Sequence, residues 1–121
     1  MKISNPTAVQ GEELATNFLK KRGYKIIDRN FRKGYGEIDI IAIKSKILVF
    51  VEVKTRTSNF FGTPFEQITP FKLHSVVRSA QFYKMLHPEH PVAMRIDAIS
   101  VELDYSGNVS KIEHMENISG W

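Results

Sequence analysis

Two stretches rich in isoleucine and valine, residues 37–43 and 47–54, are separated only by the polar segment Lys44-Ser45-Lys46. This spacing constrains the fold strongly, because β-branched residues favour strands and so short a connection joins only antiparallel neighbours. We expect Ile43 to lie opposite Leu48, which sets the register of the whole hairpin. One face of the hairpin is then wholly apolar and carries the pairs Ala42–Val49, Ile40–Val51 and Ile38–Val53.

The other face of this hairpin begins with apolar pairs and then changes character. In the same register Asp39 lies opposite Glu52, and Glu37 lies opposite Lys54. Opposed side chains in an antiparallel ladder have Cβ atoms about 4.5–5.5 Å apart, so three carboxylates and an amine gather at one end of the surface. A slip of one residue would separate Asp39 from Glu52, and the prediction therefore depends on the register.

An amphipathic helix is expected before the hairpin, from Asn5-Pro6 to Arg22, with Gly23 as the stop signal. At 100° per residue, Glu12 points to the apolar side of this helix, whereas Glu13 falls on the solvent side. A buried carboxylate needs a cation, a hydrogen-bond donor or a proton. Glu12 is therefore a candidate functional group, and Glu13 is not.

The remaining pattern completes a single α/β domain over residues 1–121. We expect a strand over 24–31, a turn at Gly34-Tyr35-Gly36 and a loop over 55–63. A capping-box pattern at Thr63-Pro64-Phe65-Glu66 precedes a helix that ends near Leu86 and that restarts or kinks at Thr69-Pro70. Strands over 92–103 and 109–115 follow. The predicted fold is a mixed central sheet flanked by helices, in the order α-β-β-β-α-β-β.

Composition excludes several classes of function. The chain has no cysteine, which removes disulfides, thiolate zinc sites and cysteine nucleophiles. The longest apolar run, Ile47–Val51, is far shorter than the roughly 20 residues of a membrane-spanning helix. The first residues lack the apolar stretch of a secretory signal. We therefore expect a cytoplasmic protein without a membrane partner.

The charge is unevenly distributed along the chain. Residues 1–56 contain twelve basic and six acidic side chains, whereas residues 57–121 contain five and seven. A basic half favours a polyanionic partner such as nucleic acid, because each Lys or Arg on a phosphate releases a counterion. An ordinary basic surface would explain the same numbers.

The acidic group on the hairpin indicates phosphodiester chemistry. Facing carboxylates repel each other, and hard oxygen ligands of this kind suit Mg²⁺ or Mn²⁺. An ion there would polarise a phosphoryl oxygen and lower the pKa of a bound water, and Lys54 on the same face would orient that water. The alternative is a plain ion-pair cluster of Asp39 and Glu52 with Lys54, Arg32 or Arg56.

These residues carry a family resemblance. Asp39 followed after twelve residues by Glu52-Val53-Lys54 resembles the PD-(D/E)XK nuclease signature, although Ile38 replaces the proline of that signature. More narrowly, the chain resembles the YraN (UPF0102) family over roughly residues 11–115. The matching segments are Gly11-Glu12-Glu13-Leu14-Ala15, Gly23-Tyr24, Arg29-Asn30, Gly36-Glu37-Ile38-Asp39, Val49 to Arg56, Gly62 with Pro64, Lys72 and Arg95-Ile96-Asp97.

The resemblance implies a restriction-endonuclease-like core and similarity to archaeal Holliday junction resolvases. It implies that Asp39, Glu52 and the backbone carbonyl of Val53 bind Mg²⁺ (or Mn²⁺), and that Lys54 is the catalytic lysine. Glu12 would be the helix-borne catalytic acid, and Glu37 would complete the acidic cluster. A nuclease fold does not by itself guarantee nuclease activity.

Other candidates flank this cluster. Arg29, Arg32, Lys33 and Arg56 are expected to grip a phosphate backbone, Tyr35 to stack on a splayed base, and Lys72 to face the site, unless they are ordinary surface groups. Among the four histidines, only His87-Pro88-Glu89-His90 has metal-like spacing, and in this proline-flanked loop solvation is the favoured interpretation. The adjacent Phe60 and Phe61 suggest a dimer contact, a wedge into nucleic acid or a fold back onto the domain.

The sequence thus favours a metal-dependent endonuclease acting on DNA, with branched or damaged structures as candidate substrates. A symmetric junction as substrate would require a homodimer. Two alternatives remain: a nucleic-acid-binding module without catalysis, and a protein–protein adaptor whose acids pair with basic neighbours.

Overall fold

The computed structural model describes residues 5–57, 65 and 68–119 of the 121-residue chain. The predicted α/β layout and its element order are confirmed. The elements are α1 (Pro6–Lys21), β1 (Lys25–Phe31), β2 (Ile38–Lys44), β3 (Ile47–Arg56), α2 (Pro70–Leu86), β4 (Met94–Leu103) and β5 (Val109–Met115). The predictions for Phe60, Phe61 and most of the capping-box pattern at 63–66 lie outside the described residues.

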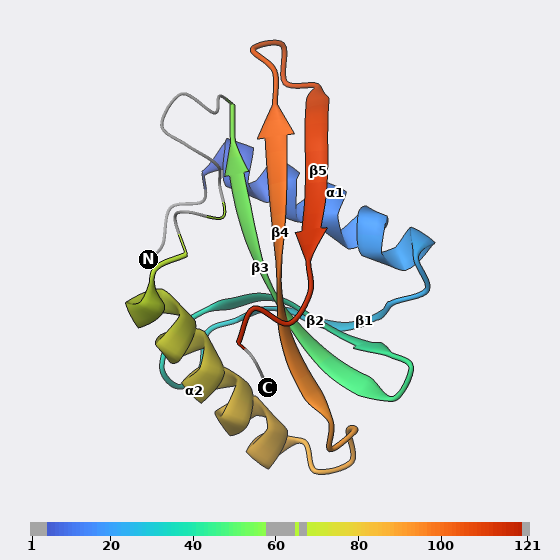
Figure 1. The fold of residues 1–121 in the computed structure, drawn as a ribbon, viewed down its shortest axis with the longest axis vertical. Coiled ribbons are helices and arrows are strands. Elements are labelled where there is room, and N and C mark those ends of the chain that lie inside the picture. The colour runs from blue at the N-terminus through green and yellow to red at the C-terminus, as the bar shows by residue number, and fades with distance from the viewer. Residues whose placement is uncertain (1–4, 58–64, 66–67, 120–121) are drawn as a thin grey trace.

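The five strands form one sheet in the spatial order β1-β2-β3-β4-β5 (Figure 1). Neighbouring strands are antiparallel except β3 and β4, which are parallel and are connected through α2. Alternate residues of β3 enter two different cores: Val49 and Val51 pack with α1, whereas Leu48 and Phe50 pack with α2. Because side chains alternate across a strand, the two helices cover opposite faces of the sheet.

The predicted hairpin register is confirmed over most of its length. Ile43 pairs with Leu48, and the ladder continues to Ile40 opposite Val51. The turn is one pair tighter than expected, because Lys44 also pairs with Ile47. Ser45 and Lys46 both have positive φ values, 49° and 62°, which is the backbone of the two-residue turns that fit the twist of a hairpin.

The predicted apolar face fails at one residue. Ile38 was expected beside Val53 on the side of Ile40, but it packs on the α2 side with Phe31, Ile41 and Phe50. The reason is that β2 and β3 cease to pair beyond Ile40 and Val51. Past that point the strands diverge, and the alternation assumed for a regular ladder no longer applies.

Helix ends follow local sequence signals. The side chain of Asn5 accepts a hydrogen bond from the Thr7 amide at 2.9 Å, as expected of an N-cap. Gly23, directly after the C-cap residue of α1, has a φ of +85°, which glycine adopts without a Cβ penalty. Thr69 caps α2 at Pro70, so the predicted restart at Thr69-Pro70 is the N-terminus of this helix.

A buried polar network holds the end of the described chain against β4. Asp97 is fully buried and accepts two hydrogen bonds from the Arg95 guanidinium, at 2.8 and 2.9 Å, and one from the Asn117 amide at 2.9 Å. His114 Nε2 lies 2.7 Å from the Asp97 carboxylate. Burial alone would raise the pKa of Asp97, but the hydrogen bonds from His114 and Arg95 outweigh it and hold the pKa below its usual range.

Within the described residues, neither helix has the length and apolar character needed to cross a membrane.

Helix α1 approaches β3 at Gly11. A Cβ atom at this position would lie 1.8 Å from Thr55 Oγ1 and 2.7 Å from Thr55 Cβ. The absence of a side chain therefore lets the helix cross the end of β3 and brings Glu12, the next residue, to that end of the sheet.

We predict that Gly11→Ala lowers the free energy of unfolding by about 1–3 kcal/mol. At a helix position with free space, alanine stabilises the helix by about 1 kcal/mol relative to glycine. A loss of stability in Gly11→Ala would therefore come from the collision with Thr55. Denaturant unfolding should measure it, with Asn17→Ala at an exposed position of the same helix as the control. A stabilised Gly11→Ala variant would contradict the close approach.

Candidate functional site

A polar pocket of about 200 Å³ lies where α1, β2, β3 and the start of α2 meet. We call it the acid pocket. It is lined by Ala8, Glu12, Glu37, Asp39, Glu52, Val53, Lys54, Thr55 and Lys72. The structure thus brings together the four acids and Lys54 that the sequence singled out, and Lys72 in the first turn of α2 lines the same pocket, where it was expected to face the site.

Asp39 sits at the point where β2 leaves β3. Its Oδ2 accepts a hydrogen bond from the Val53 amide at 2.7 Å, so a side chain takes the place of the next backbone acceptor along the ladder. Burial and the charge of Glu52 raise the pKa of Asp39 to about 8, with smaller contributions from Glu12 and Glu37, although the Val53 bond opposes the shift. Such a carboxyl is costly to ionise without a cation.

Three carboxylates converge at this position. Oxygens of Glu12, Glu37 and Asp39 lie within 4.8 Å of one another. With the Asn30 amide turned so that its nitrogen faces the acids, it donates to Glu12 Oε1 at 2.8 Å and to Glu37 Oε1 at 3.3 Å. Asn30 therefore bridges acids that come from α1 and from the segment before β2.

Sequence reasoning assigned no role to Asn30. In the structure Asn30 has a φ of 54°, a left-handed conformation that asparagine tolerates better than most residues. The residues next to Asn30 in the sequence do not indicate that its side chain bridges two acids, because Glu12 and Glu37 come from other elements of the chain.

Glu52 is the most buried acid of the pocket, at 3 % exposure. Its Oε1 lies 2.8 Å from Lys72 Nζ and 3.8 Å from Lys54 Nζ. Its Oε2 is buried and has no hydrogen-bond partner among the described residues. A buried, unsatisfied carboxylate oxygen is costly, so this atom marks a place where a further positive group would be stabilising.

The pKa values of the two lysines of the pocket are shifted in opposite directions. Burial and the neighbouring Lys72 lower the pKa of Lys54 despite the attraction of Glu52. Burial also acts to lower the pKa of Lys72, but its hydrogen bonds with Glu52 and Lys54 outweigh that effect and raise it. Lys72 is therefore the protonated counter-ion of Glu52, whereas Lys54 loses its proton more readily than Lys72 does.

The donor set of the pocket fits a hard divalent cation. Four carboxylates within or beside one small cavity offer only oxygen ligands, which Mg²⁺ and Mn²⁺ prefer. Glu52 Oε2 is buried without a hydrogen-bond partner among the described residues, and burial together with the charge of Glu52 raises the pKa of Asp39, so a cation in the pocket would stabilise both carboxylates.

The predicted basic flank is only partly gathered around the pocket. Arg32 lies 3.5 Å from Glu37, at the rim. Arg29 instead pairs with Glu13 of α1 at 3.0 Å, and Arg56 is directed to Glu102 of β4 at 3.9 Å. Lys33 and Tyr35 are exposed on the segment that leads into Glu37.

The His87–His90 loop is only partly solvated. Glu89 is exposed, but the rings of His87 and His90 pack against Tyr83, with centroids 4.3 and 6.1 Å from that ring. Ligand-type atoms of His87, Glu89 and His90 lie within 4.8 Å of one another, so two histidines that were not expected to form a ligand set do converge.

Comparison with known proteins gives a family but no activity. The profile of the uncharacterised protein family UPF0102 matches residues 11–101. A UPF0102 protein of Alkaliphilus oremlandii is 46 % identical over 109 residues, which cover 88 % of this chain and 92 % of the relative. Those of Syntrophomonas wolfei and Geobacter metallireducens are each 42 % identical, over 107 and 108 residues, covering 88 % and 89 % of this chain and 91 % and 87 % of the relatives.

The raised pKa of Asp39 predicts a pH-dependent penalty on the metal-free protein. In the unfolded chain the pKa of this carboxyl is about 4, and in the folded chain it is about 8. The folded state binds more protons between these values, so stability falls as pH rises through that window. Asp39→Asn should therefore raise the free energy of unfolding by about 1 kcal/mol or more at pH ~8 in chelator, with little effect at pH ~4.

Thermal or denaturant unfolding across this pH range measures the effect. Glu113→Gln, which changes an exposed carboxylate on β5, serves as the control and should leave the pH profile of stability nearly unchanged. An Asp39→Asn variant with the same pH profile as the parent would show that Asp39 carries no such strain.

Proposed function

The chain belongs to the UPF0102 family, and on that premise we propose that its acid pocket is the centre of a metal-dependent nuclease that hydrolyses phosphodiester bonds in DNA. Branched or damaged DNA is the proposed substrate. The observation that carries the proposal is the buried Glu52 Oε2 without a hydrogen-bond partner among the described residues, beside three convergent carboxylates and two lysines. A structural ion-pair cluster would instead satisfy its buried oxygens.

The ligands of the proposed Mg²⁺ or Mn²⁺ ion are Asp39, Glu52 and the backbone carbonyl of Val53, with Glu12 and Glu37 completing the negative shell. The ion would supply Lewis-acid polarisation of a phosphoryl oxygen and a water of lowered pKa. Asp39 is prepared for this role because the Val53 amide holds one of its oxygens in place. Asn30 fixes Glu12 and Glu37 in the same way.

Lys54 and Lys72 have different roles in the proposed reaction. Lys54 is only 18 % exposed at its side chain, and burial lowers its pKa; its amine would orient the attacking water. Lys72 is protonated beside Glu52. Its positive charge would stabilise the negative charge that develops on the phosphate oxygens in the transition state.

The substrate backbone would be held by the positive groups around the pocket. Arg32 and Lys33 lie on the segment that enters the pocket and would make these contacts. Arg29 and Arg56 are paired with Glu13 and Glu102 and would add positive charge only farther along β1 and β3. A homodimer would present two acid pockets to the two strands of a symmetric junction. With DNA as its substrate, the protein would act in the cytoplasm.

Metal binding should be directly measurable by isothermal titration calorimetry with Mn²⁺ and with Mg²⁺. We expect one site per chain, and we expect Glu52→Gln to weaken the affinity about 10-fold or more, because it removes a charged oxygen ligand. Glu113→Gln is the matched control at an exposed site. Absence of binding, or equal binding by the parent and Glu52→Gln, would contradict the proposed metal site.

Cleavage is tested with labelled four-way junctions, nicked duplexes and linear duplexes in the presence of Mg²⁺ or Mn²⁺. Asp39→Asn and Lys54→Ala should each lower the rate by about 100-fold or more, whereas Lys111→Ala, an exposed lysine on β5, should retain it. Cleavage that survives in Asp39→Asn would refute the assignment.

Two other outcomes of the same assay identify the rival functions. Salt-sensitive binding of DNA or RNA without any cutting or metal dependence would identify a non-catalytic nucleic-acid module. No affinity for nucleic acid and no thermal shift with Mn²⁺ would favour a protein–protein adaptor.

A further inference from the structure

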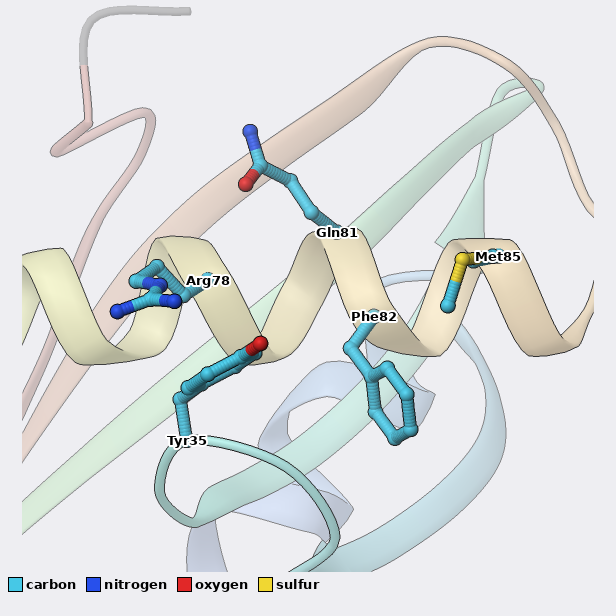
Figure 2. Close-up of a pocket in the computed structure, with 5 residues that line it drawn as sticks. All are labelled: Tyr35, Arg78, Gln81, Phe82 and Met85. Carbon is cyan, nitrogen blue, oxygen red and sulfur yellow. The ribbon is translucent and has the colours of Figure 1, made fainter.

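A second pocket, of about 260 Å³, lies between the loop before β2 and the exposed side of α2. We call it the tyrosine pocket. Figure 2 shows Tyr35 rising from the loop toward the helix, with Arg78 on one side of it and Phe82 on the other. Its lining is Tyr35, Arg78, Gln81, Phe82 and Met85, without an acidic side chain among these described residues.

The loop that carries Tyr35 is pressed onto α2 at both of its glycines. Gly34 has a φ of +91°, and a Cβ there would lie 3.0 Å from the Phe82 ring. The Gly36 carbonyl accepts a hydrogen bond from Ser79 Oγ at 3.3 Å. Tyr35 is therefore displayed by a backbone that is packed on both sides, which limits the entropy lost when a ligand stacks on its ring.

The chemistry of the tyrosine pocket combines a cation with flat and apolar surfaces. The Arg78 guanidinium carbon lies 3.8 Å from the centroid of the Tyr35 ring. Tyr35 is 52 % exposed and Met85 68 % exposed, so part of the tyrosine side chain and an apolar side chain of the pocket remain open to solvent. A planar ring that is attached to a phosphate matches this set, because aromatic rings stack on bases and arginine binds phosphate.

The segment before β2 and helix α2 each contribute residues to both the tyrosine pocket and the acid pocket. Tyr35 and Glu37 are two residues apart, so their Cα atoms are separated by at most about 7 Å. Lys72 and Arg78 are on the same helix, with about 9 Å of axial rise between them. This spacing corresponds to about two or three stacked nucleotides.

From this arrangement we propose that the tyrosine pocket binds an unpaired nucleobase, two or three nucleotides from the phosphate that occupies the acid pocket, with Arg78 on the intervening backbone. This inference rests on the proposed function and narrows its substrate class. A base can stack on Tyr35 only when it is out of its pair. The preferred substrates are therefore strands with bulges, gaps, frayed ends or junction points, and uninterrupted duplexes are poor ligands.

Binding without metal separates this inference from the catalytic one. The probe is a DNA duplex with one bulged 2-aminopurine, compared with the same duplex in which that base is paired, and both are titrated with the full chain in EDTA. The bulged probe should bind about 10-fold or more tightly, and stacking on Tyr35 should quench its fluorescence. Tyr35→Ala should remove most of this preference, and Tyr35→Phe should restore it because the ring is retained.

The chain offers matched controls for both side chains. Tyr105, at the turn after β4, is 92 % exposed, and Tyr105→Ala should leave the preference intact. Arg22 lies 3.6 Å from the centroid of Phe18 in a cation–π contact like that of Arg78. Arg78→Gln should weaken binding of the bulged probe and reduce its salt dependence, whereas Arg22→Gln should not remove the preference.

Equal affinity of the parent protein for the two probes would overturn the proposal. So would a preference that survives in Tyr35→Ala, or a loss in Tyr35→Ala that Tyr35→Phe does not restore. If the bulged-base preference appears but no variant or metal condition gives cleavage, the base site stands and the nuclease assignment fails. If cleavage depends on Asp39 but not on Tyr35, the nuclease assignment stands and the base site fails.

Discussion

The hydrogen bond from the Val53 amide to Asp39 Oδ2 is the contact on which the candidate site depends. It pairs the amide of Val53, two residues beyond the last β2–β3 pair of Ile40 with Val51. Because a side chain replaces a backbone acceptor here, the strands can separate without leaving the Val53 donor unpaired. Their separation opens the space that Glu12 enters from α1 and Lys72 from α2.

Two buried aspartates show how differently the fold treats the same group. Asp97 receives donors from Arg95, His114 and Asn117, and its pKa is lowered. Asp39 receives one backbone donor among three other carboxylates, and its pKa is raised. Groups of the first kind stabilise a fold, whereas groups of the second kind reduce stability and concentrate where ligands bind.

Helix α2 connects the parts of the proposed substrate path. Its first turn places Lys72 against Glu52, and its exposed side places Arg78 over Tyr35. The opposite side of the same helix packs on the sheet through Val76, Ala80 and Tyr83. The helix is therefore both the cover of one core and the support that fixes two pockets at a defined spacing.

The sequence alone determined the element order, the hairpin register up to Ile40 and Val51, and the inward direction of Glu12, because turn length and side-chain periodicity depend only on neighbouring residues. The tertiary structure alone decided that Ile38 changes sides, that Asn30 bridges two acids and that Lys72 pairs with Glu52. These features depend on where strands diverge and how α2 packs, and such contacts between residues distant in the chain leave no local pattern.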